Sequence, residues 1–452
     1  MKSSDVVKPF SLETYRLRRE RFAKTLSQKH SSFLCLFWSG AELVRNFDSH
    51  FPFRAHSNFL YLSGFSEPES MIILEHKSGK TKSIIALRPR DLSPNRGSEV
   101  WEGERVGVER APQFLGFDEA VSIDGIDEFL KAKMAQHSCV FWEFGEFKTW
   151  DSKLIEFSRS VRNYRTNEAI HDWSDPSFAL HEMRKIKSSE EIAVMRKSAE
   201  IASRAHIRAM QLIRPRMYEF EIAAETERVF KKEGALGPAY NSICATGENA
   251  CTLHYVSNQA QVQQGDIFLM DAGCEYHGYA SDITRSFPAT GKFSQAQREI
   301  YSVVLEAQLA AINAVRPGAP WSKPHEAAVK KIAEGLRRLK ILKAPMKKIM
   351  KERLWSKYMP HGTSHWLGLD VHDSGKYFES DKKPVKLRAG NVLTIEPGLY
   401  FRGDDRSVPK KYRGIGIRIE DDVLVTRQGH EVLTQYCPKE IEDIEALRAP
   451  RL

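Results

Sequence analysis

The chain has 452 residues, 41% of them hydrophobic and 28% charged, a composition typical of a water-soluble globular protein with more residues than one hydrophobic core usually holds. It contains no run of about eighteen apolar residues, and residues 1–5 begin no apolar segment, so we expect neither a membrane span nor a secretory signal. The net charge of +9 comes from 68 basic and 59 acidic residues, an excess too mild to indicate a nucleic-acid partner without a binding motif.

The first part of the chain has an α/β pattern. Between residues 10 and 170, short apolar runs such as 32–38 and 71–74 alternate with helical stretches and turns. We therefore expect an N-terminal α/β domain over residues 1–180, followed by a second domain over residues 181–452.

The second part interleaves helices with strand pairs. Residues 188–191 form a capping-box signature, which predicts a long helix beginning near residue 188. A second helix is expected from residue 222 towards residue 234, and another capping box at 294–297 predicts a helix that ends near 317–318. Strand pairs between such helices, without a glycine-rich phosphate loop, favour an antiparallel α+β fold over a nucleotide-binding sheet.

Two aspartates lie in strand-like segments of this second part. Residues 266–273 are typical of a buried strand, residues 278–287 of another, and the glycine-containing stretch between them suits an antiparallel hairpin. Asp271 and Asp282 would then face each other across the ladder.

Two glutamates follow apolar segments nearer the C-terminus. Residues 392–395 form an apolar run that leads into Glu396, and the alternation over residues 416–420 places Arg418 and Glu420 on one face of a strand. An acid at the end of an apolar run is costly to bury unless it is paired or bound to a metal.

A histidine-rich segment supplies a further candidate ligand. Residues 361–373 contain His361, His365 and His372 among glycines, and we expect one of the three to bind metal and the other two to be proton or hydrogen-bond partners. Four carboxylates and one neutral imidazole carry about four negative charges, which matches two divalent cations. Each residue alone would be interpreted as a cap or a solvated side chain, but that interpretation explains the whole set poorly. The pattern therefore predicts a carboxylate-bridged two-metal hydrolase site.

The cysteines and the lysine-rich stretch indicate no further chemistry. The six cysteines are scattered, with no Cys-x-x-Cys spacing, so we expect reduced thiols in a cytosolic protein. Cys274 lies close to Asp271, but we expect it to be a small buried strand residue rather than a nucleophile. The lysines of residues 340–351 are expected to form a solvated face.

Several motifs resemble those of one enzyme family. They are residues 270–276, 279–287, 361–373, 394–400 and 412–422. Their sequences look like those of Xaa-Pro aminopeptidase (aminopeptidase P), in the pita-bread metallopeptidase family. Residues 61–69 and 180–188 also resemble that enzyme. The resemblance implies a C-terminal pita-bread catalytic domain with an antiparallel sheet flanked by helices. It also implies an N-terminal α/β domain that serves substrate access and oligomerisation.

The resemblance also implies roles for individual residues. Asp271 would hold one metal ion, Asp282, Glu396 and Glu420 would bridge or flank both, and His365 would complete the second site. The other candidate catalytic residues match family positions that contact substrate, move protons or lie near the site: His254, His361, His372, Tyr400 and Arg418. Asp48 and Trp101 match positions that reach an active site, often that of a neighbouring subunit, so a homodimer or homotetramer is expected. The role of Arg184 is left open.

The chemistry implied is hydrolysis without a protein nucleophile. Two cations about 3.5–4 Å apart can activate one bridging hydroxide and polarise the scissile carbonyl. Glu396 would accept the proton of that water, and His361 or His372 would stabilise the oxyanion or assist the leaving nitrogen. The oxygen-rich donor set and the resemblance favour Mn(II). The expected substrates are peptides with proline at the second position.

Three alternatives remain at this point. A proline dipeptidase (prolidase) of the same family would share the five ligands but require a substrate that ends at proline. A pita-bread protein that has lost catalysis and binds histones, peptides or RNA typically lacks the metal ligands. Both such a protein and metal-free amidinohydrolase chemistry of the creatinase type are disfavoured, because the five metal-binding side chains are present in this sequence.

Overall fold

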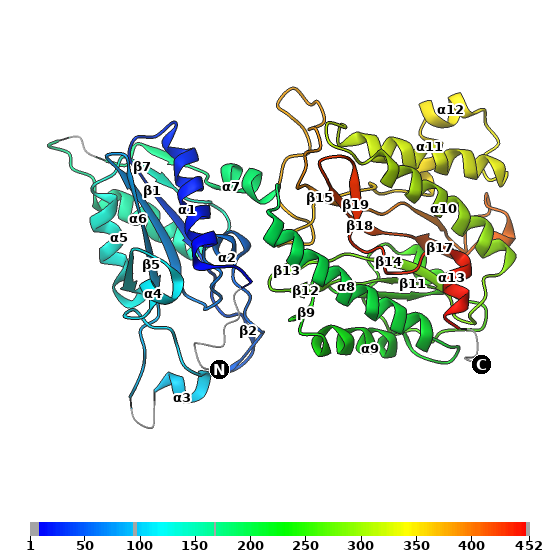
Figure 1. Cartoon of the computed structure of the whole chain (residues 1–452), viewed down its shortest axis with the longest axis horizontal. Helices are drawn as coiled ribbons and strands as arrows, with labels where there is room; N and C mark the ends of the chain where they lie inside the picture. Colours follow the sequence, from blue (N-terminus) through cyan, green and yellow to red (C-terminus); the bar gives the residue numbers. More distant parts are fainter. Residues whose placement is uncertain (1–8, 94–96, 167–168, 449–452) are drawn as a thin grey trace. The chain divides into compact units, whose positions relative to one another are not determined.

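The computed structural model describes residues 9–93, 97–166 and 169–448 and divides the chain into two units, Met1–Arg184 and Lys185–Leu452 (Figure 1). Residues 1–5, which bear on the expectation about a secretory signal, lie outside the described residues. Among the described helices, none has the length and apolar character needed to cross a membrane.

The N-terminal unit is built on a mixed six-stranded sheet of strand order β6-β5-β4-β1-β7-β8. β1 pairs antiparallel with β4 and β4 with β5, whereas the β5–β6, β1–β7 and β7–β8 pairs are parallel. The strands of the sheet are β1 (Phe33–Trp38), β4 (Met71–Lys77), β5 (Lys80–Leu87), β6 (Glu119–Ser122), β7 (Cys139–Phe141) and β8 (Asp172–Ser174), and β2 (Val44–Asn46) and β3 (Ser49–His50) form a separate antiparallel pair. This arrangement agrees with the α/β pattern of the sequence.

Helices surround this sheet, and its core includes Leu34, Ile73, Ile84, Leu130 and Leu154. The helices are α1 (Leu12–Ser27), α2 (Ser57–Ser63), α3 (Ser98–Glu102), α4 (Ala111–Leu115), η2 (Ile123–Gly125), α5 (Ile126–Met134), α6 (Lys148–Ser160) and α7 (Ser177–Arg184). Apolar residues on alternate positions of β1, β4 and β5 meet α5 and α6, and this burial stabilises the layer.

The C-terminal unit contains two helix pairs, with α8 beside α9 and α10 beside α11 (Figure 1). Both expected capping boxes are present, because Ser188 and Ser294 each cap a long helix and accept from the backbone N–H three residues on. The helices are α8 (Ser189–Leu212), α9 (Glu219–Lys232), η3 (Gly247–Cys251), α10 (Gln295–Ala314), α11 (Ser322–Arg338), α12 (Met346–Lys351), η4 (Leu354–Lys357), η5 (Lys410–Tyr412) and α13 (Ile441–Ala446).

Short antiparallel sheets lie between these helix pairs. Their strand orders are β10-β11-β14, β13-β12-β9, β15-β18-β19 and β16-β17. The strands are β9 (Gly237–Pro238), β10 (Ile243–Thr246), β11 (Ile267–Asp271), β12 (Cys274–Tyr276), β13 (Tyr279–Ala280), β14 (Thr284–Pro288), β15 (Val392–Ile395), β16 (Gly398–Phe401), β17 (Ile415–Arg418), β18 (Asp421–Val425) and β19 (His430–Val432). The antiparallel sheet flanked by helices is therefore confirmed.

The prediction that Asp271 and Asp282 face each other across a ladder is wrong. Asp271 pairs with Thr284 at the end of the β11–β14 ladder, and Asp282 lies just before β14. The small hairpin of β12 and β13 occupies the chain between them and shifts the register. At Gly273, any Cβ would collide with the carbonyl oxygen of Ser281, so this close crossing of the two chain segments requires glycine.

The single strand expected over residues 416–420 is also interrupted. β17 ends at Arg418, and Glu420 precedes β18. The backbone N–H of Ile419 points to the carbonyl of Pro397, whereas that of Glu420 donates to the carbonyl of Thr284. The chain changes partners at this point, so Arg418 lies in the β16–β17 ladder whereas Glu420 lies just before the strand that pairs with β15.

Candidate metal centre

All five candidate metal ligands line one cavity of about 460 Å³ in the C-terminal unit. This volume is in the range of ordinary small-molecule sites. Among the other candidate catalytic residues, His254, His361, His372 and Arg418 line the same cavity. Tyr400, in β16, does not line it but bonds to two residues that do. The structure thus brings together residues from segments separated by well over a hundred positions.

Asp271 is held from two sides at the end of β11. Its Oδ2 accepts a hydrogen bond of 2.6 Å from a guanidinium nitrogen of Arg418, and its Oδ1 lies 2.6 Å from the hydroxyl of Tyr240. The same hydroxyl is 2.5 Å from Oδ1 of Asp282. Tyr240 therefore links the two aspartates. The pairing of the strands alone does not place the aspartates opposite each other.

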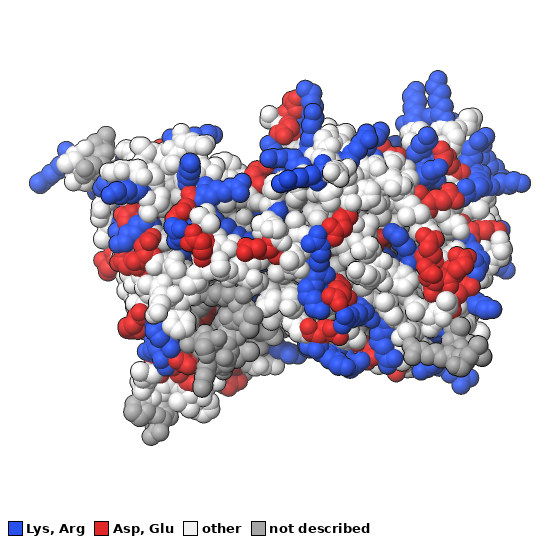
Figure 2. All heavy atoms as spheres, in the orientation of Figure 1, with Lys and Arg blue, Asp and Glu red and all other residues white. Residues whose placement is uncertain are grey.

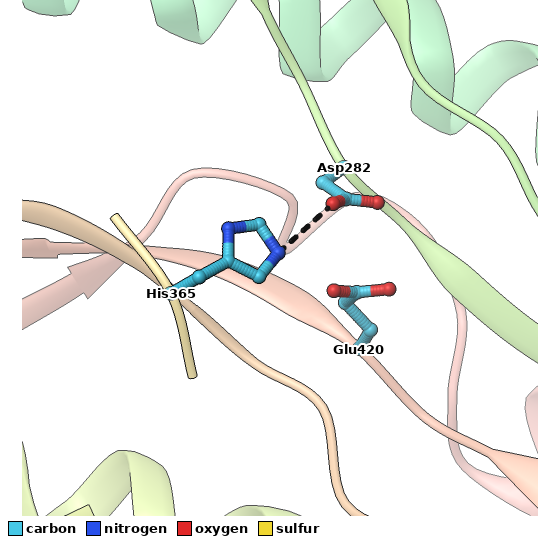
Figure 3. Close-up of side chains that lie close together, drawn as sticks. All are labelled: Asp282, His365 and Glu420. Atoms are coloured by element: carbon cyan, nitrogen blue, oxygen red, sulfur yellow. Dashed lines mark ion pairs between the residues drawn. The ribbon is translucent and has the colours of Figure 1, made fainter. Parts of the chain in front are cut away.

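His365 and two carboxylates form the tightest group in the cavity (Figure 3). Potential ligand atoms of Asp282, His365 and Glu420 all lie within 4.8 Å of one another, and His365 Nε2 is 3.4 Å from Asp282 Oδ2. The other ring nitrogen, Nδ1, lies 3.0 Å from the carbonyl of Trp366, which fixes the ring so that Nε2 faces the acids. Thr284 donates a hydrogen bond of 2.6 Å to Oε2 of Glu420 and so orients that carboxylate.

Glu396 follows directly after β15, and its backbone connects it to the histidine segment. Its N–H donates to the carbonyl of Thr363 at 2.9 Å, and the backbone N–H of Thr394 donates to the carbonyl of His365 at 3.0 Å. The carboxylate Oε1 is 3.7 Å from His365 Nε2. The β15 strand therefore positions both Glu396 and His365 at the cavity.

The ring of His361 is engaged at both nitrogens. Its Nδ1 lies 2.6 Å from the carbonyl of Gly362, and its Nε2 lies 2.9 Å from the hydroxyl of Tyr400. Because Arg418 donates to that hydroxyl at 2.8 Å, the tyrosine proton is free to point to Nε2. Nδ1 then carries the ring proton of a neutral imidazole. His372, by contrast, is exposed and stacks edge-on against His365 with ring centroids 4.5 Å apart.

The electrostatics of the acids are those of a crowded anionic cluster. Burial and the neighbouring carboxylates raise the pKa of Asp282, raise the pKa of Glu420 well above its usual range, and raise the pKa of Glu396 to about 7. Asp271 is different: burial opposes its ionisation, but the charge of Arg418 and the hydrogen bonds from Tyr240, Arg418 and Thr284 together outweigh burial and lower its pKa. The sequence predicted this crowding, but not that one of the acids is already paired with arginine.

The histidines respond to the same environment. Burial disfavours the charged form of His365, but Asp282 and Glu396 outweigh it and raise the pKa of His365 to about 9. Burial and the charge of Arg418 lower the pKa of His361 to about 4. Burial, followed by the charge of His365, also lowers the pKa of His372. The protonated ring of His365 thus occupies the place where a cation would balance the acids.

This donor set fits divalent metal ions. Four carboxylates and one imidazole, without thiolate, are hard ligands suited to a pair of divalent cations. Orientation of the imidazole by Trp366, and of one carboxylate by Thr284, is the support that metal ligands usually receive from their neighbours.

A buried ion network lies next to Glu420, and no local pattern in the sequence predicted it. Asp421 is bonded at 2.6 Å by Arg285 and at 2.6 Å by Lys439, and these charges outweigh burial and hold the pKa of Asp421 at about 2. Next to it, Oδ2 of Asp422 accepts from the backbone N–H of Asp282 at 3.1 Å. The network fixes the start of β18 and the turn that presents Asp282.

The remaining candidates lie in the N-terminal unit. Asp48 is exposed in the turn between β2 and β3, and Trp101 is 82% exposed on α3. Arg184 is buried at the end of α7 and donates to Oδ1 of Asn58 at 2.7 Å.

The cysteines behave as the sequence predicted. All six are free, and Cys274 is buried in β12 beside Ser198 and Ser281. Burial raises the pKa of its thiol to about 11, which argues against a nucleophilic thiolate.

Known proteins resemble this chain over nearly its whole length. The Xaa-Pro aminopeptidase of Haemophilus influenzae is 42% identical, covering 95% of this chain and 96% of its own. That of Escherichia coli is 41% identical, covering 97% and 98%. The structure of proline aminopeptidase P II from Yersinia pestis matches with a TM-score of 0.93 at 40% identity, covering 98% of this chain and all of its own. Zinc-substituted E. coli aminopeptidase P in complex with product matches with a TM-score of 0.92 at 40% identity, covering 97% and 98%.

Family models match both units. The model of the aminopeptidase P N-terminal domain covers residues 15–141, and the model of metallopeptidase family M24 covers residues 193–427, the segment that supplies all five candidate ligands. The chain therefore belongs to metallopeptidase family M24, with the pita-bread fold and the N-terminal domain of aminopeptidase P.

Proposed function

We propose that this protein is a metal-dependent aminopeptidase that releases the N-terminal residue from peptides with proline at the second position. The observation that carries the proposal is the meeting of five metal-binding side chains in one cavity, in a chain similar to Xaa-Pro aminopeptidases from end to end. Loss of catalysis is disfavoured, since each carboxylate and the imidazole of the donor set are present.

Asp271, Asp282, His365, Glu396 and Glu420 would hold two divalent cations. When bound, such cations supply Lewis acidity towards the scissile carbonyl and lower the pKa of water. We propose Mn(II) as the native metal, because the donor atoms are oxygen-rich and no thiol is among them.

The protein's own groups would move the protons. We propose that Glu396, which lines the cavity beside the imidazole of His365, accepts a proton from the attacking water. His361 is engaged by Gly362 and Tyr400, so its nitrogens are not available to substrate in this conformation. We therefore assign assistance of the leaving nitrogen to His372, with His254 as a second exposed imidazole on the cavity wall.

The cavity also suits a proline residue. Ile243, Leu253, Val256 and Val371 line it beside the acids, and apolar side chains can pack against a pyrrolidine ring. The bond that precedes proline lacks an N–H, so recognition has to come from the substrate's other groups. The acids of the cavity, alone or through bound cations, can capture a free α-amino group, which restricts cleavage to the first residue.

The decisive experiment compares two substrates and four metals. Protein stripped with a chelator is reloaded with manganese, cobalt, zinc or iron and assayed on an Xaa-Pro-Xaa tripeptide beside an Xaa-Pro dipeptide. We expect tripeptide hydrolysis, highest with manganese. Rapid dipeptide turnover with an inert tripeptide would make the protein a proline dipeptidase instead, and failure to retain any metal would favour a non-catalytic binding protein.

We further propose that the N-terminal unit mediates self-association as a dimer or tetramer. It exposes large apolar side chains near the two candidate residues: Phe47 is 96% exposed beside Asp48, and Val100 is 69% exposed beside Trp101. Sedimentation of the Trp101→Ala variant tests this, and an unchanged oligomeric mass would count against a role for this surface. A reducing compartment, the cytoplasm, is proposed from the six unpaired thiols.

A further inference from the structure

One short stretch of the C-terminal unit carries the whole net charge of the chain. Residues 330–357 contain 11 of the 68 basic residues but only 2 of the 59 acidic ones, Glu334 and Glu352. The rest of the chain therefore has 57 basic and 57 acidic residues and no net charge. The excess of +9 is a local property of this segment rather than a general bias in composition.

The fold displays these charges together on the surface. The stretch runs from the last turns of α11 through α12 to η4, and Figure 2 shows Lys and Arg gathered over α11 and α12. Some of these cations are neutralised, since Lys331, Arg338, Lys348 and Lys357 have carboxylate partners within 4.0 Å. Seven exposed cations have no acidic partner among the residues that the structure describes, and we call them the basic surface: Lys330, Arg337, Lys340, Lys343, Lys347, Lys351 and Arg353.

A shallow hollow lies within the same stretch. It is lined by the cations Arg337, Arg338, Lys340 and Lys343, by the apolar side chains of Leu342 and Met346, and by Glu334, whose carboxylate is paired with Lys331. Cations and apolar side chains that line one open hollow can receive a phosphate-bearing headgroup and the carbon atoms attached to it. The lining thus points to a ligand that is anionic at one end and apolar at the other.

We propose that the basic surface docks the protein on a bilayer rich in anionic phospholipids. Clusters of four to eight Lys and Arg are typical of such electrostatic contacts. The exposed Met350, 37% accessible among the lysines of α12, adds an apolar contact at the same place. This proposal departs from the sequence-based expectations of a merely solvated lysine face and no membrane partner.

Nucleic acid fits the same surface less well. Trp355, the aromatic residue of the stretch, and the adjacent Tyr358 are buried and cannot stack on bases. α12 has only 6 residues, too few for a helix that reads the major groove. A nucleic acid would therefore contact this surface through its phosphates alone and would leave the apolar side chains of the hollow without a contact.

The test compares two variants with the same net charge. In the first, four cations of the basic surface are reversed: Lys340→Glu, Lys343→Glu, Lys347→Glu and Lys351→Glu. In the second, four exposed cations elsewhere on the same unit are reversed: Lys232→Glu, Lys292→Glu, Lys386→Glu and Arg427→Glu. Full-length proteins are co-sedimented with phosphatidylcholine vesicles with or without phosphatidylserine, over a series of salt concentrations. Tripeptide hydrolysis reports whether each variant is folded.

We expect the natural protein to sediment with phosphatidylserine vesicles only, and less so as salt rises. Each cation contributes about fivefold to such binding, so the first variant should lose at least about 100-fold in affinity while the second retains binding. Equal loss in both variants would show that only net charge matters and would overturn the proposal, as would absence of binding by the natural protein. Displacement from vesicles by duplex DNA at equal phosphate concentration would identify a nucleic-acid surface instead.

Discussion

Replacing Tyr240 with phenylalanine should weaken metal binding without unfolding the protein. The hydroxyl lies 2.6 Å from Asp271 and 2.5 Å from Asp282, so its removal takes away the group that ties the two aspartates together. A phenol has one proton, so both short contacts are attractive only when one carboxylate accepts that proton and the other donates its own. The raised pKa of Asp282 is consistent with that arrangement.

The size of the effect follows from this single proton. A hydrogen bond to a charged group contributes about 1.5–3 kcal/mol, and Tyr240 supplies one such bond at a time. Since about 1.4 kcal/mol corresponds to a tenfold change in affinity, the Tyr240→Phe variant should bind its metal ions about 10- to 100-fold more weakly. Phenylalanine fills nearly the same volume, so thermal unfolding of the metal-free protein should change little.

Calorimetric titration of metal-stripped protein with manganese measures this loss. The matched control is Tyr412→Phe, which removes a hydroxyl bonded at 2.5 Å to Glu299, a carboxylate outside the cavity. Unchanged or tighter manganese binding by Tyr240→Phe would refute the reasoning, because the aspartates would then be organised without the tyrosine. The same loss in both variants would indicate a general effect on the fold.

Three other outcomes are expected. Glu420→Ala should abolish peptide hydrolysis and lose metal, whereas His372→Ala should slow hydrolysis with metal retained; comparable metal loss by elemental analysis in both would mean that the histidines are misassigned. Metal binding at pH 7 should release protons, including that of His365, whose pKa is raised to about 9 and whose ring must be neutral to ligate; affinity should therefore rise with pH up to about 9, and a binding enthalpy that is the same in buffers of different ionisation enthalpy would contradict this. Asp421→Asn should destabilise the protein by about 3–5 kcal/mol because it leaves Arg285 buried without its carboxylate, and an unchanged thermal midpoint would contradict this.

Local sequence signals were sufficient for the elements that carry the site. The capping boxes at Ser188 and Ser294 lie at helix starts because side-chain and backbone groups a few residues apart satisfy each other. Asp271 and Glu396 were recognisable since each follows a run of apolar strand residues, where an unpaired acid would be costly. Such signals depend on neighbours in the chain and not on the tertiary fold.

What the sequence could not provide depends on contacts between distant segments. Tyr240 lies in an irregular segment after β9, where no periodicity marks it, and its role exists only once β11 and the Asp282 turn come together. The wrong prediction that Asp271 and Asp282 pair across a hairpin has the same origin. A simple hairpin was the simplest interpretation of residues 266–287. The β12–β13 pair instead forms against β9, and it and the close crossing at Gly273 are therefore decided by tertiary packing.

The pairing of Arg418 with Asp271 changes the charge balance inferred from sequence. Four carboxylates alone would neutralise two divalent cations, but the buried guanidinium, 2.6 Å from Asp271, contributes a fifth positive charge. With both cations bound and His365 neutral, the cluster would carry one positive charge in excess. Because such an excess stabilises hydroxide relative to neutral water, it would lower the pKa of the attacking water and ease the transfer of its proton to Glu396. Arg418 thus acts on the reaction through the charge of the whole cluster, while its second bond, to Tyr400, supports the hydrogen bond between that hydroxyl and the neutral ring of His361.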